Sequence, residues 1–523
     1  MAITLGIPGK NDATGWSVIT PTSPSADTGT PAGSRLIYVS SSTGSDSNVG
    51  SLASPKQTIS GASGGMSLLR NNKPDWLLLK KGDVWTDEGF SNTGGHSGQD
   101  ASNPMVFTSY PATPGARPKL DISSSLAPYT AGTGATGGNF RVFYGIDFNC
   151  YSGDPSDGRY TNASTTFDHN PRFDYFHVED CRFLGVVPSA ASWANQHIYF
   201  PGAETRSSVL IWHRNVICHV NTMGSLWDNI ADGRFTDSTW YKTCEGLNSE
   251  NNHAFYSQET SLPYLIKNCF NVDTSYNSFK VRGGANVYNC FFARAGVMLD
   301  MYGYNQGVPY GFTVGLCTIA DNVFQEGRKT GTVAPFLSTG GGAIAVIPVT
   351  ADTGQDTDIL RNIFANNALL STESTSAIKA DPVAKNTRIN NNRCALWGQG
   401  KFFEQDAGVG TATTTFSGNI LDANGNGTED VSGLAMSTYG WTHPTYTLAD
   451  YGTSVGIASS TFDKVMQEVI LQSKDNWRVA YTAPAVNDFF RTQFGMTLLG
   501  VDGDGGGGGA AAAGFRRPRI KMR

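Results

Sequence analysis

Acidic, basic and aromatic side chains gather in three short segments near the middle of the chain. These segments are His253–Glu259, Ser278–Arg282 and Val297–Tyr302. Alternation along a strand predicts that Ser278, Lys280 and Arg282 share one face, while the residues between them face the other way. Gln258 precedes Lys280 by 22 residues, and Lys280 precedes Asp300 by 20. This nearly constant step predicts that the three side chains lie on neighbouring rungs of one sheet.

Such a row suits two reactions. Elimination from a uronate needs a base near the C5 proton and positive charge on the carboxylate, which Lys280 and Arg282 would supply. Hydrolysis of a glycosidic bond needs two carboxylates about 5–10 Å apart, and Asp300 with Glu259 is the nearest pair. The candidate catalytic residues are Lys280, Arg282, Asp300 and Glu259, and the candidate carbohydrate-binding residues are Tyr256, Gln258, Tyr302 and His253. The alternative is an ordinary solvated outer face of a sheet.

The sequence gives little support for a metal site. Asp422, Asn424 and Asn426 match the start of a calcium-binding loop, but Gly433 stands where the loop needs a bidentate Glu. A turn is the favoured interpretation of this segment. No two histidines have the HxH or HExxH spacing of a zinc site. We therefore expect no metal or cofactor, with calcium at the 422–426 segment as the open alternative.

Composition restricts the scaffold that could align these side chains. The chain has 523 residues, a formal net charge of −6 and only 16% charged residues, against roughly 25% in typical globular proteins. Its 39% hydrophobic content excludes intrinsic disorder, and no apolar run approaches the ~18 residues of a membrane span. The acidic balance disfavours nucleic acid as a partner. With 61 glycines and many Ser, Thr and Asn residues, a large β protein is predicted.

The cysteines and the first residues indicate whether the protein folds in a reducing or an oxidising compartment. The eight cysteines are never closer than 21 residues, and no CxxC pair is present, which excludes zinc knuckles and thioredoxin-type redox motifs. The first ten residues show no basic region followed by an apolar one, so we expect no secretory signal. Reduced, buried thiols are then expected.

A recurring motif organises the chain. It reads Asp-Cys181-Arg-Phe183, Asn268-Cys269-Phe270, Asn289-Cys290-Phe291, Asn322-Val323-Phe324, Asn362-Ile363-Phe364 and Asn419-Ile420-Leu421. The first steps between the Asn residues are 21, 33 and 40, and the shortest fits one solenoid turn of three strands. Asn tolerates a left-handed corner and its amide can stack between turns, while the Cys and Phe after it are predicted to face the core. A β-sandwich or propeller is the alternative, but neither predicts such a corner.

The start of this region carries a family resemblance. Leu36–Ser40, Gly44–Asn48 and Ser54–Ile59 resemble the opening of the right-handed parallel β-helix proteins of the pectate-lyase-like superfamily, and Pro74–Trp85 is similar to their first coil. The resemblance implies an all-β, right-handed, single-stranded parallel β-helix with an N-terminal cap. It also implies a polysaccharide lying across one exposed sheet. Because the superfamily includes lyases, hydrolases, epimerases and inactive binding modules, the reaction stays open.

Four parts are expected along the chain. They are an extended arm at 1–35, a β-helix at 36–430 capped near 36–85, a small helical region at 431–500, and a linker with a basic tail at 501–523. The helical region is indicated by apolar residues at helical spacing, namely Phe462, Val465, Met466, Val469 and Ile470. Ser460 and Asp463 resemble a capping box. We expect this region to close the C-terminal end of the solenoid or to contact a neighbouring subunit.

The tail combines a flexible tether with a basic peptide. Five glycines and four alanines (505–513) precede Phe515, Arg516, Arg517, Arg519, Lys521 and Arg523. We expect these six residues to anchor the chain to an acidic neighbour in an assembly. A disordered tail is the alternative.

A sugar-facing β-helix normally works outside the cell, whereas no export signal is predicted. Bacteriophage virion proteins reconcile these expectations, since they assemble in the host cytoplasm and leave by lysis. We expect a virion tail spike, fibre or head-decoration protein, usually trimeric, that engages host surface polysaccharide. It would meet other virion proteins through its arm and tail, without membrane or nucleic-acid partners. The alternatives are a polysaccharide lyase or glycoside hydrolase outside a virion, and a non-catalytic structural spacer.

Overall fold

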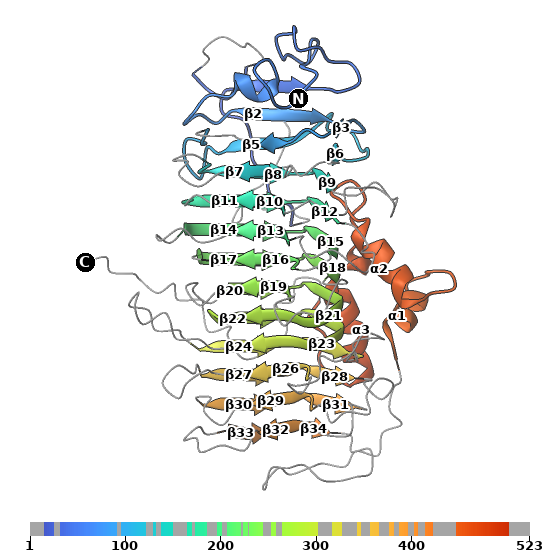
Figure 1. Cartoon of the computed structure of the whole chain (residues 1–523). Helices are drawn as coiled ribbons and strands as arrows, with labels where there is room; N and C mark the ends of the chain where they lie inside the picture. Colours follow the sequence, from blue (N-terminus) through green and yellow to red (C-terminus); the bar gives the residue numbers. More distant parts are fainter. Residues whose placement is uncertain are drawn as a thin grey trace, which may run out of the picture.

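The computed structural model shows a tall stack of parallel strands with helices along one flank (Figure 1). The described residues are 15–25, 32–91, 96–121, 129–131, 138–149, 165–169, 173–185, 196–200, 207–220, 223–228, 230–243, 253–257, 264–301, 316–326, 342–346, 356–365, 376–380, 386–395, 402–405, 414–421 and 446–500. Over these ranges, no helix has both the length and the apolar character needed to cross a membrane.

Each coil contributes strands to three faces. The first face is a 13-stranded sheet of β1 (Leu36–Val39), β2 (Trp76–Lys80), β5 (Met105–Tyr110), β8 (Arg141–Tyr144), β11 (Tyr175–Glu179), β14 (Ser207–His213), β17 (Ile230–Thr236), β20 (Tyr264–Lys267), β22 (Ala285–Tyr288), β24 (Cys317–Ala320), β27 (Thr357–Leu360), β30 (Thr387–Asn390) and β33 (Thr414–Ser417). The second face consists of β3 (Val84–Thr86), β6 (Lys119–Asp121), β9 (Asp147–Asn149), β12 (Arg182–Leu184), β15 (Val216–Val220), β18 (Thr239–Thr243), the first parts of β21 (Phe270–Val281) and β23 (Phe291–Met301), β25 (Val323–Gln325), β28 (Ile363–Ala365), β31 (Arg393–Ala395) and β34 (Ile420–Leu421).

The third face carries the segments singled out from the sequence. It consists of β4 (Phe90–Ser91), β7 (Tyr129–Ala131), β10 (Thr165–His169), β13 (Gln196–Phe200), β16 (Ser225–Trp227), β19 (His253–Ser257), the last parts of β21 and β23, β26 (Ile344–Val346), β29 (Ile378–Ala380) and β32 (Phe403–Gln405). β21 and β23 run through a corner, so the second and third faces form one 21-stranded sheet. Every strand pairing between coils is parallel, which confirms the parallel β-helix.

The first and second faces meet at a corner of two residues. The first corner residue has a φ between 51° and 68° in ten successive coils, at Gly145, Asp180, Arg214, Asp237, Asn268, Asn289, Asp321, Arg361, Asn391 and Gly418. The residue after it is buried, except that Asn419 is half-buried: Ile146, Cys181, Asn215, Ser238, Cys269, Cys290, Asn322, Asn362, Asn392 and Asn419. The left-handed turn and the buried position are therefore separate sites.

This corner corrects the predicted alignment of the repeat. Asn268 and Asn289 occupy the left-handed position, whereas Asn322 and Asn362 occupy the buried position one residue later. The sequence pattern aligned all four because Asn suits both sites. Its short side chain tolerates positive φ, and its amide can both donate and accept hydrogen bonds inside the core.

The buried position forms the expected amide ladder. Asn362 Nδ2 donates to Ile319 O (2.9 Å) and to Asn392 Oδ1 (3.1 Å), while Asn362 Oδ1 accepts from the Asn322 backbone N–H (3.0 Å). Asn392 repeats these contacts with Asn419 Oδ1. Each amide satisfies a backbone group at the corner, where the regular sheet ladder is interrupted.

The aromatic core follows a register that the sequence only partly indicated. Phe292, Phe324 and Phe364 face inward and stack with ring centroids 5.0 and 5.2 Å apart. Phe270 and Phe291, which directly follow their cysteines, were predicted to face the core but lie outward beneath the helical region. Alternation explains the difference, because the residue after the buried corner position begins the second face with its side chain outward.

The thiols agree with the sequence expectation. The six described cysteines, Cys181, Cys218, Cys269, Cys290, Cys317 and Cys394, are buried and free. Cys269 and Cys290 are neighbours in the corner column, where Cys290 Sγ accepts the backbone N–H of Cys269 at 3.4 Å. Burial raises the pKa of Cys181 and of Cys317, the latter to about 12, so these thiols behave as small apolar groups.

The N-terminal cap covers the top of the core. Its 3-10 helix η1 (Gly65–Leu68) buries Met66, and Ile59 and Leu69 are buried with it. These three side chains belong to the same apolar cluster as Ile37 and Leu77 of the first strands. The cap thus removes the apolar end that the first coil would otherwise expose to water.

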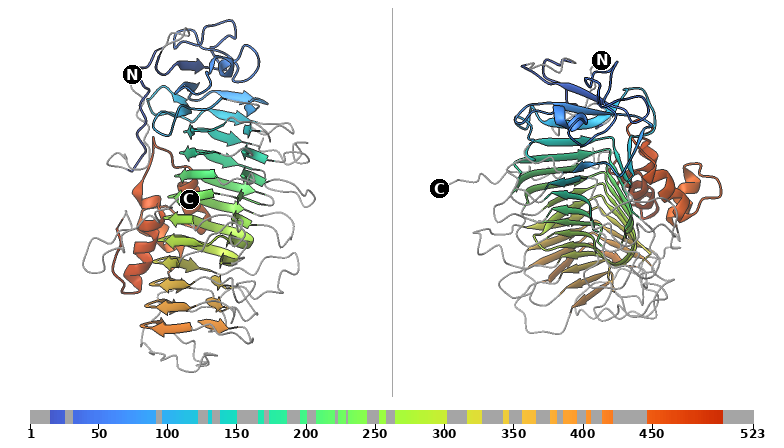
Figure 2. Two further views of the ribbon diagram at one scale, coloured as in Figure 1. Left: turned by 90° about the vertical axis from the view of Figure 1, so that its left-hand side faces the viewer. Right: turned by 45° about the horizontal axis from the view of Figure 1, so that its top comes forward.

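The helical region lies against the outer side of the second face (Figure 2). It contains α1 (Leu448–Ser454), α2 (Phe462–Ile470), the 3-10 helix η4 (Val479–Tyr481) and α3 (Ala483–Gln493). The five predicted apolar residues of α2 are buried, which confirms the amphipathic helix. The expectation that this region closes the solenoid end is wrong, since it covers outward residues such as Tyr241, Phe270 and Phe291. The cap of α2 is Thr461, whose side chain accepts from Lys464 N–H, and not Ser460.

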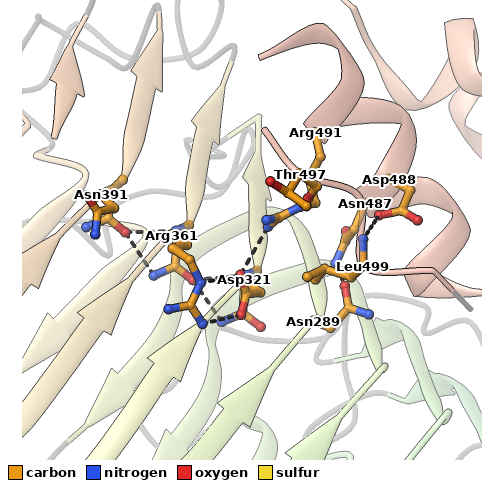
Figure 3. Close-up of polar contacts among 12 residues, drawn as sticks. Asn289, Asp321, Arg361, Asn391, Asn487, Asp488, Arg491, Thr497 and Leu499 are labelled. Carbon is orange, nitrogen blue, oxygen red and sulfur yellow. Dashed lines mark hydrogen bonds and ion pairs between the residues drawn. The ribbon is translucent and has the colours of Figure 1, made fainter. Parts of the chain in front are cut away.

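Polar contacts fix α3 to the corner column (Figure 3). Asp321 accepts from Arg361 at 2.6 Å and from Arg491 of α3 at 3.2 Å. Asn487 Nδ2 donates to Asn289 Oδ1 at 2.9 Å. The left-handed corner residues therefore serve a second purpose, since they present the polar groups to which α3 docks.

The N-terminal arm and the helical region meet at one arginine. The Arg214 guanidinium lies over two indole rings, 4.2 Å from the centroid of Trp16 and 4.3 Å from that of Trp477, and the two rings meet each other edge to face. The Ser17 backbone N–H donates to the buried carboxylate of Glu179 at 3.0 Å. The described part of the arm, residues 15–25, thus packs on the first face instead of projecting from it.

We predict that Asn362→Ala lowers the melting temperature of the protein by several degrees. The substitution leaves a backbone N–H and a backbone carbonyl in the core without their amide partners, at a cost of roughly 2–4 kcal/mol. Asn386→Ala is the matched control, because Asn386 is exposed and its side-chain amide donates to Asp356 on the sheet surface. Equal melting temperatures for the two variants would contradict the structural role of the ladder.

Candidate functional site

The third face brings together part of the predicted row. Lys280 pairs with Asp300 on the next strand, as the spacing predicted. On its other side Lys280 pairs with Tyr256, not with Gln258. The prediction that Gln258 lies beside Lys280 on the neighbouring rung is therefore wrong by two residues. More residues separate the paired positions of β19 and β21 than those of β21 and β23. The prediction assumed a constant repeat and therefore missed this difference.

Several predicted residues lie outside the described part of the chain. Gln258, Glu259 and Tyr302 follow the ends of β19 and β23, and the calcium-loop candidates Asp422, Asn424 and Asn426 follow β34. The tail residues Phe515, Arg516, Arg517, Arg519, Lys521 and Arg523 also lie outside it. Within the described ranges, no group of three or more His, Cys, Asp and Glu residues lies close enough to hold a metal ion.

A bend in β21 places Lys280. The register between β21 and β23 shifts between Thr274 and Asn277, which is one extra residue in β21. At this bend the Oδ1 atom of Asn271 accepts from Thr274 (3.0 Å) and from Ser278 (3.2 Å) inside the core. Ser278 was predicted to face outward with Lys280 but is fully buried. At the second corner two consecutive residues, here Ser278 and Phe279, face inward before alternation resumes.

Asp300 is the most unusual group in the row. Its side chain is only 4% exposed although it lies on an outward position. Burial raises the pKa of Asp300 to about 6, and the positive charges of Lys280 and Arg282 limit this rise. A carboxyl group with a pKa close to neutrality can hold or release a proton under ordinary conditions, as a general acid or base must.

The aromatic neighbours of this carboxyl are packed in place. Tyr256 is 9% exposed and His253 is 2% exposed, and their rings stack with centroids 5.0 Å apart. Tyr256 also packs with Met223 and Leu226 in a small apolar cluster separate from the core. Little of either ring reaches water, so their role in the row is to hold neighbours as much as to meet a ligand.

The row continues beyond the residues found by sequence. Asp300 pairs with Ala345, which pairs with Lys379, which pairs with Glu404. Sequence reasoning missed Lys379 because insertions separate these coils by more than thirty residues. A local signal was present, since the segments Ala-Ile-Ala-Val (343–346) and Ala-Ile-Lys-Ala (377–380) have matching apolar positions.

Taken together, the row offers one buried carboxyl group and at least two cations beside it. Neighbouring rungs are about 4.8 Å apart, and the strand pairings place Tyr256, Lys280 and Asp300 on successive rungs along the solenoid axis. A line of this kind matches the geometry of an extended polymer. A buried acid beside fixed positive charge is suited to proton transfer at a carbon or oxygen atom that carries negative charge in the transition state.

Comparisons with known proteins give information on the fold alone. No protein-family model matches the sequence, and no curated protein does. Among solved structures, a rhamnogalacturonan lyase matches 83% of this chain and 98% of its own, with 12% identity and a TM-score of 0.37. The DFA-IIIase of Arthrobacter chlorophenolicus A6 matches 70% and 86%, with 14% identity and a TM-score of 0.40. Pectate lyase Pel9A matches 78% and 83%, with 15% identity and a TM-score of 0.32.

We predict that Asp300→Asn stabilises the protein at pH 8 and has little effect at pH 4. The pKa of Asp300 in the fold, about 6, exceeds the usual value of about 3.9, so folding favours the protonated form. The favourable contribution is complete below the usual pKa and is lost as pH rises through about 6. The loss is on the order of 3 kcal/mol, and Asn avoids it because it carries no charge.

Melting temperatures of both proteins between pH 4 and pH 8 would test this. Asp232→Asn is the matched control, since Asp232 is 42% exposed and pairs with Arg234 at 2.5 Å. A gain for Asp300→Asn that does not change with pH would show that the carboxyl group is not forced toward its neutral form.

Proposed function

We propose that the third face binds a polysaccharide of a host cell surface and cleaves it, with Asp300 as the acid–base group. The observation that supports this most directly is the buried Asp300 carboxyl opposite Lys280 and near Arg282, with a pKa of about 6. An exposed sheet row is better suited to a linear polymer than to a small molecule, which usually needs a concave pocket.

Elimination is the reaction that these residues support best. Ionised above pH 6, Asp300 would take the C5 proton of a uronate, while Lys280 and Arg282 stabilise the negative charge that develops on the uronate carboxylate. The electron pair of the C5–H bond then forms the C4–C5 double bond as the C4–O bond breaks, and the leaving glycosidic oxygen takes a proton from water. This assigns the base to Asp300 and leaves charge stabilisation to the two cations that the sequence also offered as the base.

Hydrolysis is the alternative, and it needs a second carboxylate. Glu259, the partner expected from the sequence, lies outside the described residues. Glu404 shares the row with Asp300 but stands three rungs away, about 14 Å at the usual strand spacing.

The proposal includes a place in a bacteriophage virion, as a spike, fibre or decoration protein. One structural feature supports assembly in a reducing compartment such as the host cytoplasm. Cys269 and Cys290 are direct neighbours in the corner column, and both are free thiols. Proteins that mature in oxidising compartments tend to use such pairs as disulfides. A non-catalytic spacer in the same particle is the competing role.

We expect the purified protein to release unsaturated uronate from a host capsular polysaccharide or lipopolysaccharide, with a rate that rises through pH 6. Ultraviolet absorbance would report the double bond, and a reducing-end assay would report any cleavage. Asp300→Asn is expected to lower turnover at least a hundredfold, and Asp232→Asn to leave it unchanged. Reducing ends without new absorbance would favour hydrolysis. Failure to cleave any host glycan would leave binding or spacing as the role.

The virion location predicts that peptides of this chain occur in purified particles at a constant ratio to the major capsid protein. Mass spectrometry of gradient-purified virions measures this ratio. If the particles lacked these peptides while the lysate contained the protein, the remaining role would be that of an enzyme acting outside the virion.

A further inference from the structure

The N-terminal arm and the helical region contact the same corner of the solenoid. Arg214 is the left-handed corner residue between β14 and β15, with a φ of 53°. Its guanidinium lies over Trp16 of the arm and over Trp477 of the 472–478 segment, which lies between α2 and η4. The two indole rings also meet edge to face, with centroids 5.3 Å apart. We call these three side chains the joint. They connect two segments from opposite ends of the sequence.

A second side chain is shared in the same way. Tyr144, which is 5% exposed, lies edge-on to Trp16 with ring centroids 6.5 Å apart. On the other side of the contact, Lys474 Nζ lies 5.5 Å from the centroid of the Tyr144 ring. Tyr144 ends β8, two coils before Arg214. The arm and the 472–478 segment therefore meet along a span of coils and not at a single point.

The 472–478 segment has its own anchors on the solenoid. Lys474 N–H donates to Asp180 Oδ1 at 3.1 Å, and Gln472 O accepts from Arg117 at 2.8 Å. Asp180 is the corner residue one coil before Arg214. The helices on either side of the segment are held by apolar contacts with the second face. The position of Trp477 at the joint thus depends on the docking of the helical region.

The arm is fitted closely to the arginine. Gly15 O lies 3.2 Å from His213 Nε2, and Ser17 N–H donates to Glu179. Gly15 has a φ of 81°, and a Cβ atom at this position would lie 2.8 Å from Arg214 Nη2. Both the backbone conformation and the close approach favour glycine here. A displaced guanidinium would therefore disturb this part of the arm first.

We propose that Arg214 couples the docking of the arm to the docking of the helical region, so that the arm is a strap held fully in place only while Trp477 occupies the joint. Coupling between two sites is reciprocal. A partner that draws the arm away would therefore loosen the 472–478 segment, and a partner that moves the helical region would loosen the arm. The inference goes beyond the proposed function and does not rest on it.

Hydrogen exchange of the full-length protein, followed by mass spectrometry, tests the coupling. We expect Trp477→Ala to raise the exchange rate of peptides covering residues 15–19 about tenfold, since the ring that meets both Arg214 and Trp16 is gone. Trp16→Ala should raise the exchange rate of peptides covering residues 472–478 by a similar factor. No change at residues 15–19 in Trp477→Ala would overturn the proposal.

Two controls show whether the effect is local to the joint. Peptides covering residues 22–25 should not change in Trp477→Ala, because Thr22 is held by Ser34 and Asn103 near the cap. Tyr446→Ala is the matched variant, since Tyr446 is 40% exposed and packs edge to face on Phe489 of α3. This variant should leave exchange at residues 15–19 unchanged. A rise there as large as in Trp477→Ala would mean general loosening, which also contradicts the proposal.

A double-variant cycle shows whether Arg214 carries the coupling. In the Arg214→Gln background, Trp477→Ala should raise exchange at residues 15–19 much less than in the wild type, because the shared cation is already gone. An equal rise in both backgrounds would assign the coupling to the direct contact of the two rings and overturn the role of the arginine. Melting temperatures confirm that each variant is folded.

Gly15→Ala tests the coupling from the arm if Trp477→Ala does not fold. The three atoms nearest to the new methyl group all belong to the guanidinium of Arg214, so the substitution disturbs the joint without changing a residue of the helical region. We expect faster exchange both at residues 15–19 and at residues 472–478. Faster exchange of the arm alone would show that the arm opens independently, which would overturn the proposal.

Discussion

The two-residue corner between the first and second faces fixes the register of every coil. A parallel sheet that slips by one residue turns each side chain to the opposite face. A left-handed residue followed by a buried one restarts each coil at the same point. The insertions that lengthen the coils lie elsewhere, so coils of 21 residues and of 40 stack with the same faces aligned. The Asn ladder and the docking of α3 both use this column.

The candidate site lies on the two strands that join the second face to the third. β21 and β23 run from the second face into the third without a loop, so Lys280 and Asp300 stand on two continuous strands. The bend in β21 is held from inside by Asn271, which accepts hydrogen bonds from residues on both sides of it. Groups that must keep a fixed relation to one another are better placed on such strands than on loops. The register set at the corner thus reaches the third face over the shortest available path.

The parallel β-helix, the pairing of Lys280 with Asp300 on neighbouring rungs, and the amphipathic helix at 462–470 could all be predicted from periodicity, because each depends on local spacing. The errors have a different origin. Asn268 and Asn322 look equivalent in sequence but occupy different corner positions, and only backbone conformation separates them. The pairing of Tyr256 with Lys280 depends on how much chain the turn after β19 takes up. The flank on which the helices lie depends on outward apolar residues such as Phe291, which the repeat alone assigned to the core.

Asp300 and Glu179 are both buried acids, but their pKa values shift in opposite directions. Burial raises the pKa of Glu179, but the hydrogen bond from His177 and the nearby charge of His213 outweigh this, so its pKa is lower than usual. Glu179 also receives the Ser17 N–H, and it serves to hold the arm. The Asp300 carboxyl keeps a raised pKa despite two neighbouring cations. In a solenoid each rung contacts only its neighbours. The free-energy cost of burying the Asp300 carboxyl therefore stays local, and the stacked Asn and Phe side chains of nearby coils can offset it. On the next strand the paired residue is the uncharged Ala345. The elimination that we propose would give the Asp300 carboxyl a role at this position, as a proton acceptor near neutral pH.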